Sequence, residues 1–291
     1  MIQIAADYFT DPVCSWSWAN EPVLRRLLCA YGHDMVIHHR MGGLLGSRDA
    51  AFVDAQNALS GPDPVQYREH QDEVCRGAQV PFDARVWDRH APLSSYPACI
   101  AVKAAGLQGA GFEAAYLRRV REAFFTECRP VDSRDALLAL AREVTGLDLE
   151  RFAVEVDGPL ARENFAADLV ATRTPVPGAR DVKTEPDGAR RYGFPTMVLM
   201  NGVGDARVLD ADHCFDDYRQ SIQELAPDLV ATQPPTPLEF LGRFGRVTTR
   251  EVADCCGLDF DAARRQLEQL EKDGRVLGRP VAEHHMWRAL P

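Results

Sequence analysis

The hydrophobic pattern of the first forty residues changes from the period of a strand to that of a helix and back. Short apolar runs at 2–9 and 35–39 predict two strands. Between them, apolar residues recur at a spacing of four from Ala19 to Tyr31, which predicts one helix that begins near Cys14. A strand, a helix and a second strand in this order indicate a β-α-β unit with parallel strands.

The pattern then stays helical over a long stretch. Apolar residues keep helical spacing at 112–117, 137–141 and 160–171, which predicts a large all-helical insertion over about residues 48–190.

Strand signals return after the insertion. The continuous apolar run 196–200 has the length of a buried strand, and Asn201-Gly202 supplies residues that tolerate a tight turn. The run at 206–209 then predicts the second strand of a hairpin, and a helix near 214–225 completes an α/β domain.

The prolines of residues 231–237 cannot continue a helix, so we expect a boundary there between a domain at 1–230 and a small domain at 237–291. In the second domain, Thr248 and Glu251 fit a capping box at the start of a short helix. Further runs predict a longer amphipathic helix and a two-stranded wing. This order of elements is that of a winged-helix domain.

Composition narrows the classes of partner. The chain has 291 residues, of which 46% are hydrophobic and 26% charged, enough for two domains. The net charge of -10 disfavours non-specific attraction to nucleic acid or anionic membranes. Residues 237–291 hold nine basic and nine acidic side chains, a poor surface for DNA. We therefore expect this segment to contact a protein partner or to pack within the molecule, and we expect no DNA or membrane partner.

The first residues show neither a basic segment nor an apolar run of signal-peptide length, so we expect a cytoplasmic protein. The eight cysteines indicate reduced thiols rather than a disulfide framework, and no pair has the C-x-x-C spacing. The sequence predicts no metal site, because the pairs His38-His39 and His284-His285 have no cysteine or carboxylate at ligand spacing and are expected to be solvated.

Cys14 stands where the first strand gives way to the first helix. Asp11-Pro12 force a turn before the helix and present Cys14 at its tip. Unpaired backbone N–H groups and the positive end of the helix dipole favour the thiolate, so the position predicts a nucleophilic Cys14 with a lowered pKa.

Several further motifs follow Cys14 in a fixed order. They are Asp11-Pro12-Val13-Cys14-Ser15-Trp16-Ser17-Trp18 with Glu21-Pro22, then Ser94-Ser95-Tyr96-Pro97-Ala98, Ala123-Phe124-Phe125-Thr126 and Gly193-Phe194-Pro195-Thr196. Over about residues 1–225 the chain resembles the cytosolic DsbA-like family, which includes the FrnE oxidoreductases and the ClpXP adaptors. The resemblance implies a thioredoxin-like fold, a cis bond before Pro195 that faces Cys14, and a winged-helix-like C-terminal domain as in the adaptor branch.

The family motif usually has a second cysteine where this chain has Ser17. A serine hydroxyl is too weakly acidic to attack a disulfide at neutral pH, so Cys14 would need an external thiol such as glutathione to release a mixed disulfide. Cys29 lies about 22 Å further along the predicted helix and cannot resolve it if that helix is continuous. The thiols of Cys99, Cys128, Cys214, Cys255 and Cys256 are expected to pack in the core or between helices.

Three functional hypotheses stay open. The first is a thiol–disulfide oxidoreductase or isomerase with a monothiol C-x-x-S site: Cys14 is the nucleophile, Ser17 donates a hydrogen bond to its thiolate, and Pro195 shapes the substrate groove. Substrate contacts are expected from Trp16, Phe194, Thr196 and Asp11, whereas Trp18 is expected to pack in the core. The second is a non-catalytic adaptor that binds a protein partner, and the third is a glutathione-binding transferase or isomerase. No tightly bound cofactor is expected.

Overall fold

The computed structural model describes residues 2–46, 64–184, 188–211 and 213–290. Its central sheet has four strands in the order β2-β1-β5-β6: β1 (Ile4–Thr10), β2 (Met35–Met41), β5 (Thr196–Asn201) and β6 (Ala206–Leu209). The first two strands pair in parallel, as the β-α-β pattern predicts, and β5 pairs antiparallel to both β1 and β6. The thioredoxin-like sheet is therefore assembled from the two ends of the first 210 residues.

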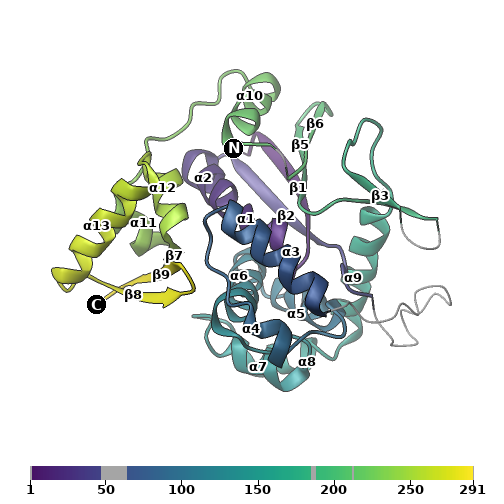
Figure 1. Ribbon diagram of the computed structural model, residues 1–291. Helices are drawn as coiled ribbons and strands as arrows, with labels where there is room; N and C mark the ends of the chain where they lie inside the picture. The colour runs from purple at the N-terminus through teal and green to yellow at the C-terminus, as the bar shows by residue number, and fades with distance from the viewer. Residues whose placement is uncertain (1, 47–63, 185–187, 212, 291) are drawn as a thin grey trace.

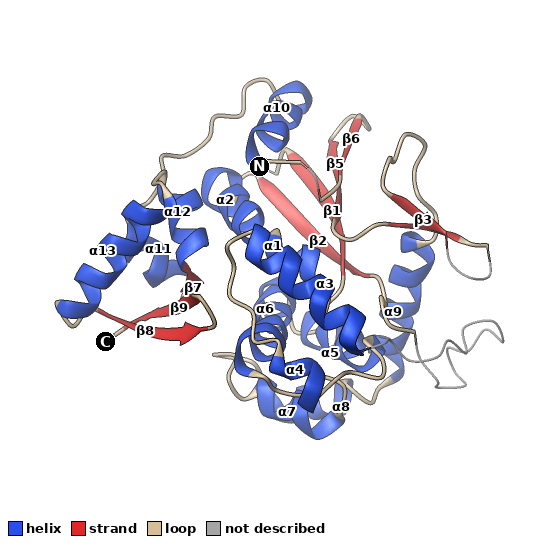
Figure 2. Cartoon of the chain, in the orientation of Figure 1, coloured by secondary structure: helices blue, strands red, loops and turns tan. Residues whose placement is uncertain are grey.

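Helices cover the sheet on both faces (Figure 1). One face packs against α2 (Glu21–Tyr31) and α10 (Phe215–Leu225), in a core that includes Tyr8, Leu27 and Ile222. The other part of the molecule is a block of helices that lies below the sheet in the view of Figure 2. This block comes from the insertion.

The predicted helix after Cys14 is broken in two. The structure has α1 (Ser15–Ala19), then Asn20 as a cap, then α2. Pro22 stands in the first turn of α2 and has no N–H to donate to Trp18, which explains why the helix restarts here.

The insertion is helical for most of its length but not to residue 190. Its helices are α3 (Pro64–Gly77), α4 (Arg85–Arg89), α5 (Tyr96–Gly106), α6 (Ala110–Glu127), α7 (Arg134–Ala141), α8 (Leu149–Glu155) and α9 (Pro159–Thr172). A two-stranded hairpin of β3 (Val182–Thr184) and β4 (Arg190–Tyr192) then follows. The prediction of an all-helical insertion over 48–190 is wrong at this end, because strands of three residues carry too little alternation to be recognised. Its predicted start lies outside the described residues.

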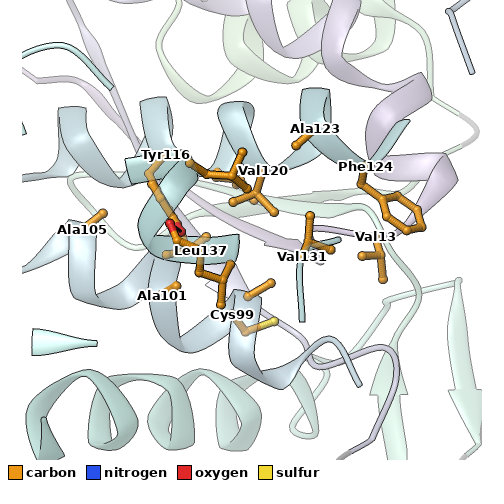
Figure 3. Packing of buried hydrophobic residues seen from close by; sticks show 14 of the residues in the cluster. Val13, Cys99, Ala101, Ala105, Tyr116, Val120, Ala123, Phe124, Val131 and Leu137 are labelled. Atoms are coloured by element: carbon orange, nitrogen blue, oxygen red, sulfur yellow. Dashed lines mark hydrogen bonds between the residues drawn. The ribbon is translucent and has the colours of Figure 1, made fainter. Parts of the chain in front are cut away.

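The main core joins the insertion to the Cys14 region. Val13, in the turn before α1, lies in the same cluster as Cys99 of α5, Phe124 of α6 and Val131 before α7. Figure 3 shows these side chains converging between the helices. The turn that carries Cys14 is therefore packed directly onto the insertion.

Residues 237–290 form helices and a three-stranded sheet. In chain order they are α11 (Pro237–Phe244), β7 (Arg246–Thr248), α12 (Thr249–Cys256), α13 (Phe260–Lys272), β8 (Val276–Val281) and β9 (His284–Ala289), with the sheet ordered β7-β9-β8. The capping box of Thr248 and Glu251 forms as predicted, and Gly257 ends α12 in the left-handed conformation. The short strand β7 was not predicted, since three residues again give no clear period.

This C-terminal segment packs closely on the rest of the chain, at the left of Figure 1. Helix α12 lies against α2, and Cys29 of α2 belongs to the C-terminal core together with Phe240 and Trp287. Between α2, α6 and α12 lies a group of buried, mutually paired charges that we call the ion cluster: Glu21, Arg25, Arg118, Arg121, Glu122 and Glu251. The boundary at 231–237 stays a prediction, and the contact across it is extensive.

Among the described residues, no helix combines the length and the apolar character needed to cross a membrane.

Candidate functional site

Cys14 is the N-cap of α1, at the end of the turn that follows β1. Its side chain is only 5% exposed and lies in a small apolar cluster with Phe9, Tyr192 and Phe194. The Cys14 Sγ donates a hydrogen bond to the backbone oxygen of Phe194 at 3.6 Å. The thiol is therefore held between the helix start and the loop that precedes β5.

Burial raises the pKa of the Cys14 thiol, and the nearby Asp11 carboxylate adds to the rise. Hydrogen bonds from the side chain and the backbone N–H of Ser17, and the charge of Arg121, act in the opposite direction without overcoming it. The prediction of a lowered pKa is wrong, because desolvation of the thiolate outweighs the helix start.

Ser17 is fully buried, one turn into α1, and its hydroxyl lowers the pKa of the Cys14 thiol. Its oxygen accepts a hydrogen bond from the Thr10 hydroxyl at 2.8 Å. Thr10 in turn accepts a hydrogen bond from Arg121 of α6. The role of Ser17 as a donor to the Cys14 sulfur stays a prediction.

Asp11 is fully buried and faces the protein interior. Its carboxylate accepts hydrogen bonds from the N–H groups of Val13 at 2.9 Å and Leu44 at 2.7 Å, and from the Ser95 hydroxyl at 2.8 Å. Burial raises the pKa of Asp11, while these hydrogen bonds lower it. The expected substrate contact at Asp11 is therefore not available: the side chain fixes the turn that carries Cys14.

The Phe194–Pro195 peptide bond is cis, which is the isomer that the family resemblance implies. Phe194 is 6% exposed, and the guanidinium of Arg191 lies over its ring at 4.8 Å. Gly42, just after β2, is so close that a Cβ there would lie 1.9 Å from the Phe194 ring. The loop around Pro195 is thus held from both sides.

Thr196 does not reach the surface. It is 1% exposed in β5, and its hydroxyl donates to the backbone oxygen of Gly193 at 2.8 Å. The expected substrate contact at Thr196 is replaced by a contact within the loop itself.

Trp16 and Trp18 point in different directions. Trp16 is 41% exposed and lies near His70 of α3, with ring centroids 6.5 Å apart. Trp18 is fully buried, stacks on Phe125 and donates its indole N–H to the oxygen of Pro81 at 2.9 Å. The prediction that Trp18 packs in the core is confirmed, and Trp16 is the aromatic ring at the surface beside the Cys14 turn.

The remaining cysteines are mostly buried. Cys29, Cys75, Cys99 and Cys255 are buried, and Cys128 and Cys256 are partly exposed. Cys214 is exposed, so its predicted burial is wrong: as the N-cap of α10 it faces solvent. The Cys255 thiol of α12 donates to the backbone oxygen of Pro22 at 3.9 Å, and the neighbouring Cys255 side chain is the first cause of the lowered pKa of Cys29 in α2.

His39 is buried rather than solvated. Desolvation lowers its pKa to about 3, so the ring is neutral at physiological pH. Its neighbour His38 is exposed, and His284 and His285 are partly exposed. Within the residues that the structure describes, no cluster of three His, Cys, Asp or Glu side chains is arranged to hold a metal ion.

Arg121, Thr10 and Gly42 were not recognised from the sequence. Arg121 lies within an ordinary helical pattern, and only the fold brings it under Thr10. It also lines a cavity of about 990 Å³ between α2, α6 and residues 242–246, which it shares with Glu21 and Arg118. A lone glycine after a strand gave no signal that a ring would pack on it.

Residues 8–175 match the profile of a protein family described as Thioredoxin. The chain belongs to this thioredoxin family. The matched region runs from β1 through the helical insertion and contains Cys14, Ser17 and Trp16.

The thioredoxin chain is similar to proteins of two kinds. The ClpXP adapter protein SpxH of Halalkalibacterium halodurans is 29% identical over 285 residues, which cover 97% of this chain and 87% of that protein. The cytosolic disulfide reductase DsbM from Pseudomonas aeruginosa is 25% identical, with a TM-score of 0.56, and covers 76% of this chain and 97% of its own. DsbM has also been solved with GSH, a match of 24% identity and TM-score 0.54 over 76% of this chain and 98% of that one.

Proposed function

We propose that the protein is a thiol–disulfide oxidoreductase with a monothiol site, in which Cys14 is the nucleophile, Ser17 its hydrogen-bond donor and Pro195 part of the substrate groove. The observation that carries the proposal is the geometry of one thiol. Cys14 lies at the start of α1, one turn before the buried Ser17, and donates a hydrogen bond to the carbonyl of Phe194 in the loop before Pro195. The similarity to a disulfide reductase supports the same chemistry.

The reaction proceeds in two exchanges. The Cys14 thiolate attacks one sulfur of a substrate disulfide, forms a mixed disulfide and releases the other sulfur as a thiolate. Ser17 cannot complete the cycle, so a glutathione thiolate attacks the mixed disulfide and releases Cys14. With a glutathionylated protein as substrate, the net products are the free protein thiol and oxidised glutathione. Glutathione is thus a co-substrate and not a bound cofactor.

The raised pKa of Cys14 favours reduction of the substrate over its oxidation. An oxidising site of this kind depends on a strongly stabilised thiolate, which makes the disulfide form easy to reduce. Here burial and Asp11 destabilise the thiolate. The site therefore favours taking up a sulfur from the substrate, which reduces that substrate.

The proposal is tested by reduction of a glutathionylated peptide in the presence of glutathione and glutathione reductase. We expect turnover by the wild-type protein, a glutathione adduct on Cys14 in the mass spectrum, and loss of both in Cys14→Ser. Cys214→Ser is the matched control, since it removes an exposed thiol outside the site and should keep turnover. Turnover that persists in Cys14→Ser, or none in the wild type, would refute the proposal.

A non-catalytic adaptor is the second candidate, and one observation favours it. The SpxH relative aligns with 97% of the chain, which must include most of residues 237–291, whereas the disulfide reductase covers 76%. An adaptor would bind ClpXP through its surface and would not need the Cys14 thiol. Binding of purified ClpXP that is equal for wild type and Cys14→Ala, together with no peptide reduction, would establish this function instead.

The third hypothesis is a glutathione-dependent transferase or isomerase in which Cys14 or Ser17 holds glutathione. Product analysis separates it from the oxidoreductase, because conjugation yields a thioether whereas reduction yields oxidised glutathione. We further propose a cytoplasmic location, where glutathione is abundant and reduced and free cysteines persist.

A further inference from the structure

Cys14 is connected to the interior of the protein by a directed series of hydrogen bonds. Thr10, at the end of β1, lies between Ser17 and Arg121 and is fully buried. Arginine has only donor groups, so the Thr10 oxygen must accept from Arg121. The Thr10 hydrogen is then free to point at Ser17, whose oxygen lies 2.8 Å away.

The same reasoning fixes the direction of the next bond. The Ser17 oxygen accepts from Thr10, so the Ser17 hydrogen is available for the sulfur of Cys14, which stands one turn earlier as the N-cap of α1 and whose pKa the Ser17 hydroxyl lowers. A hydroxyl that donates to sulfur favours the thiolate, whereas one that accepts from the thiol favours the protonated form. The direction of the series therefore decides whether Ser17 helps or hinders the nucleophile.

Arg121 is held in place by the other members of the ion cluster. Its side chain is fully buried and pairs with Glu21, whose other oxygen accepts from Arg118 at 3.0 Å. Arg118 also binds Glu251 of α12 at 2.7 Å. Removing one partner from a buried ion pair leaves an uncompensated charge, so each member constrains the next.

We propose that Arg121 and Thr10 are positioning residues of the Cys14 site, and that Glu251, in the C-terminal segment, helps to hold Arg121 in place through Arg118 and Glu21. Arg121 sets the direction of hydrogen bonding toward the sulfur. The C-terminal segment would thereby contribute to the reactivity of a thiol that it does not contact. The inference rests on the proposed function only for its biological meaning, because thiol reactivity is measurable without turnover.

Several other groups act on the Cys14 thiol and are kept unchanged in the test. Asp11 and Tyr8 lie on the β1 side, and Cys75 of α3 is a further neighbour. Burial raises the pKa of Tyr8 to about 12 and raises the pKa of Cys75 as well, so both stay protonated where the thiol is assayed. Asp11 is present in every variant, so changes between variants report on the hydroxyl series.

The first experiment measures the alkylation rate of Cys14 by iodoacetamide against pH, with the Cys14 peptide quantified by mass spectrometry. Thr10→Val removes the hydroxyl while conserving shape, and Thr10→Ser restores it. We expect Thr10→Val to be alkylated about tenfold more slowly at pH 7, with its profile displaced to higher pH, as about one pKa unit requires. Thr10→Ser should recover most of the wild-type rate. Equal profiles for Thr10→Val and wild type would overturn the proposal.

The second experiment tests the far end of the connection. Glu251→Gln keeps the capping box, because glutamine serves at the same helix position, but removes the charge that binds Arg118. Glu239→Gln is the matched control: Glu239 caps α11 in the same way, and its carboxylate is bonded to Thr236.

The sign of the effect distinguishes positioning from simple charge. Loss of a negative charge by electrostatics alone would favour the thiolate and speed alkylation at pH 7. Loss of positioning instead frees Arg121 and slows alkylation of Cys14. We expect the rate at pH 7 to fall about threefold. A faster or unchanged rate in Glu251→Gln would remove Glu251 from the proposal, and a slowing of equal size in Glu239→Gln would mean that a general loss of stability is responsible.

The two proposals can fail separately. If wild type shows no peptide reduction but Cys14 is alkylated tenfold more slowly in Thr10→Val than in wild type, this inference stands and the proposed function is refuted. Far-ultraviolet circular dichroism and thermal unfolding of each variant show whether it is folded. Arg121→Lys, which preserves a buried donor, gives a further check: we expect a rate between those of wild type and Thr10→Val, and a rate below that of Thr10→Val would contradict the role given to Arg121.

Discussion

The thiol of Cys14 and the backbone oxygen of Phe194 are 180 residues apart in the chain and 3.6 Å apart in the fold. Only the protonated thiol can donate this hydrogen bond, so forming the thiolate gives it up. The loop before β5 therefore both presents a backbone surface to the nucleophile and favours its protonated state. We therefore expect the reactivity of the site to depend on how readily Cys14 loses its proton.

Turnover should increase with pH above neutrality. Because burial raises the pKa of Cys14, most of the thiol is protonated at pH 7 and the thiolate fraction grows through the alkaline range. Ser17→Ala removes a hydroxyl that lowers this pKa, so its profile should move to still higher pH. Ser15→Ala, a buried serine two positions away, is the control and should leave the profile in place. An acidic optimum would contradict the raised pKa.

Gly42→Ala should damage the site without touching Cys14. An added Cβ would meet the Phe194 ring at 1.9 Å, so the ring and the loop that faces Cys14 must shift. We expect at least a tenfold loss of peptide reduction, as an ångström-scale displacement at a reacting centre can cause. Gly77→Ala at the end of α3 meets nothing within 4 Å and should be active. Full activity of Gly42→Ala would show that the loop adapts freely.

The two tryptophans should separate function from stability. Trp18→Phe loses the hydrogen bond to Pro81 in a fully buried position, so we expect a loss of about 1–3 kcal/mol in the free energy of unfolding. Trp16→Phe changes an exposed ring and should leave that free energy within about 0.5 kcal/mol. Urea unfolding measures both. If Trp16 contacts substrate, Trp16→Ala raises KM for the peptide, and an unchanged KM would exclude that contact.

His39 should make the protein less stable in mild acid. Its pKa is about 3 in the folded state and about 6.5 when unfolded, so the unfolded chain binds the proton first. The stability contributed by neutral His39 is present above pH 6.5 and is lost as the pH falls toward 3, by about 2 kcal/mol at pH 5. His39→Gln should flatten this part of the curve relative to wild type, and the exposed His38→Gln should not. Parallel curves for His39→Gln and wild type would contradict the shift.

The sequence predicted the parts of the fold that carry long periodic signals. The parallel pair of strands, the hairpin after Pro195 and the helix near 214–225 are present, and a strand–helix boundary placed Cys14 correctly. The strands β3, β4 and β7 have three residues each, too few for a period to be read.

The electrostatics of the site depend on contacts between segments far apart in the chain. A cysteine at a helix start predicts a lowered pKa, but burial beneath the Phe194 loop and beside Asp11 reverses the sign. Asp11 and Thr196 belong to the motifs around Cys14 and Pro195 and were assigned to the substrate, yet both side chains turn inward. Adjacency in sequence identifies the loop that holds a site and does not tell which side of the loop a side chain occupies.

The ion cluster also determines how the molecule comes apart. Arg25 and Arg118 pair with Glu251 of α12, and Cys29 of α2 packs in the C-terminal core, so lifting α12 from α2 would give up these ion pairs and this apolar contact together. We expect the C-terminal segment and the thioredoxin part to melt in one cooperative transition, and a protease cut within residues 231–236 to leave two fragments that stay associated. The proline-rich connection thus joins two segments that unfold as one cooperative unit.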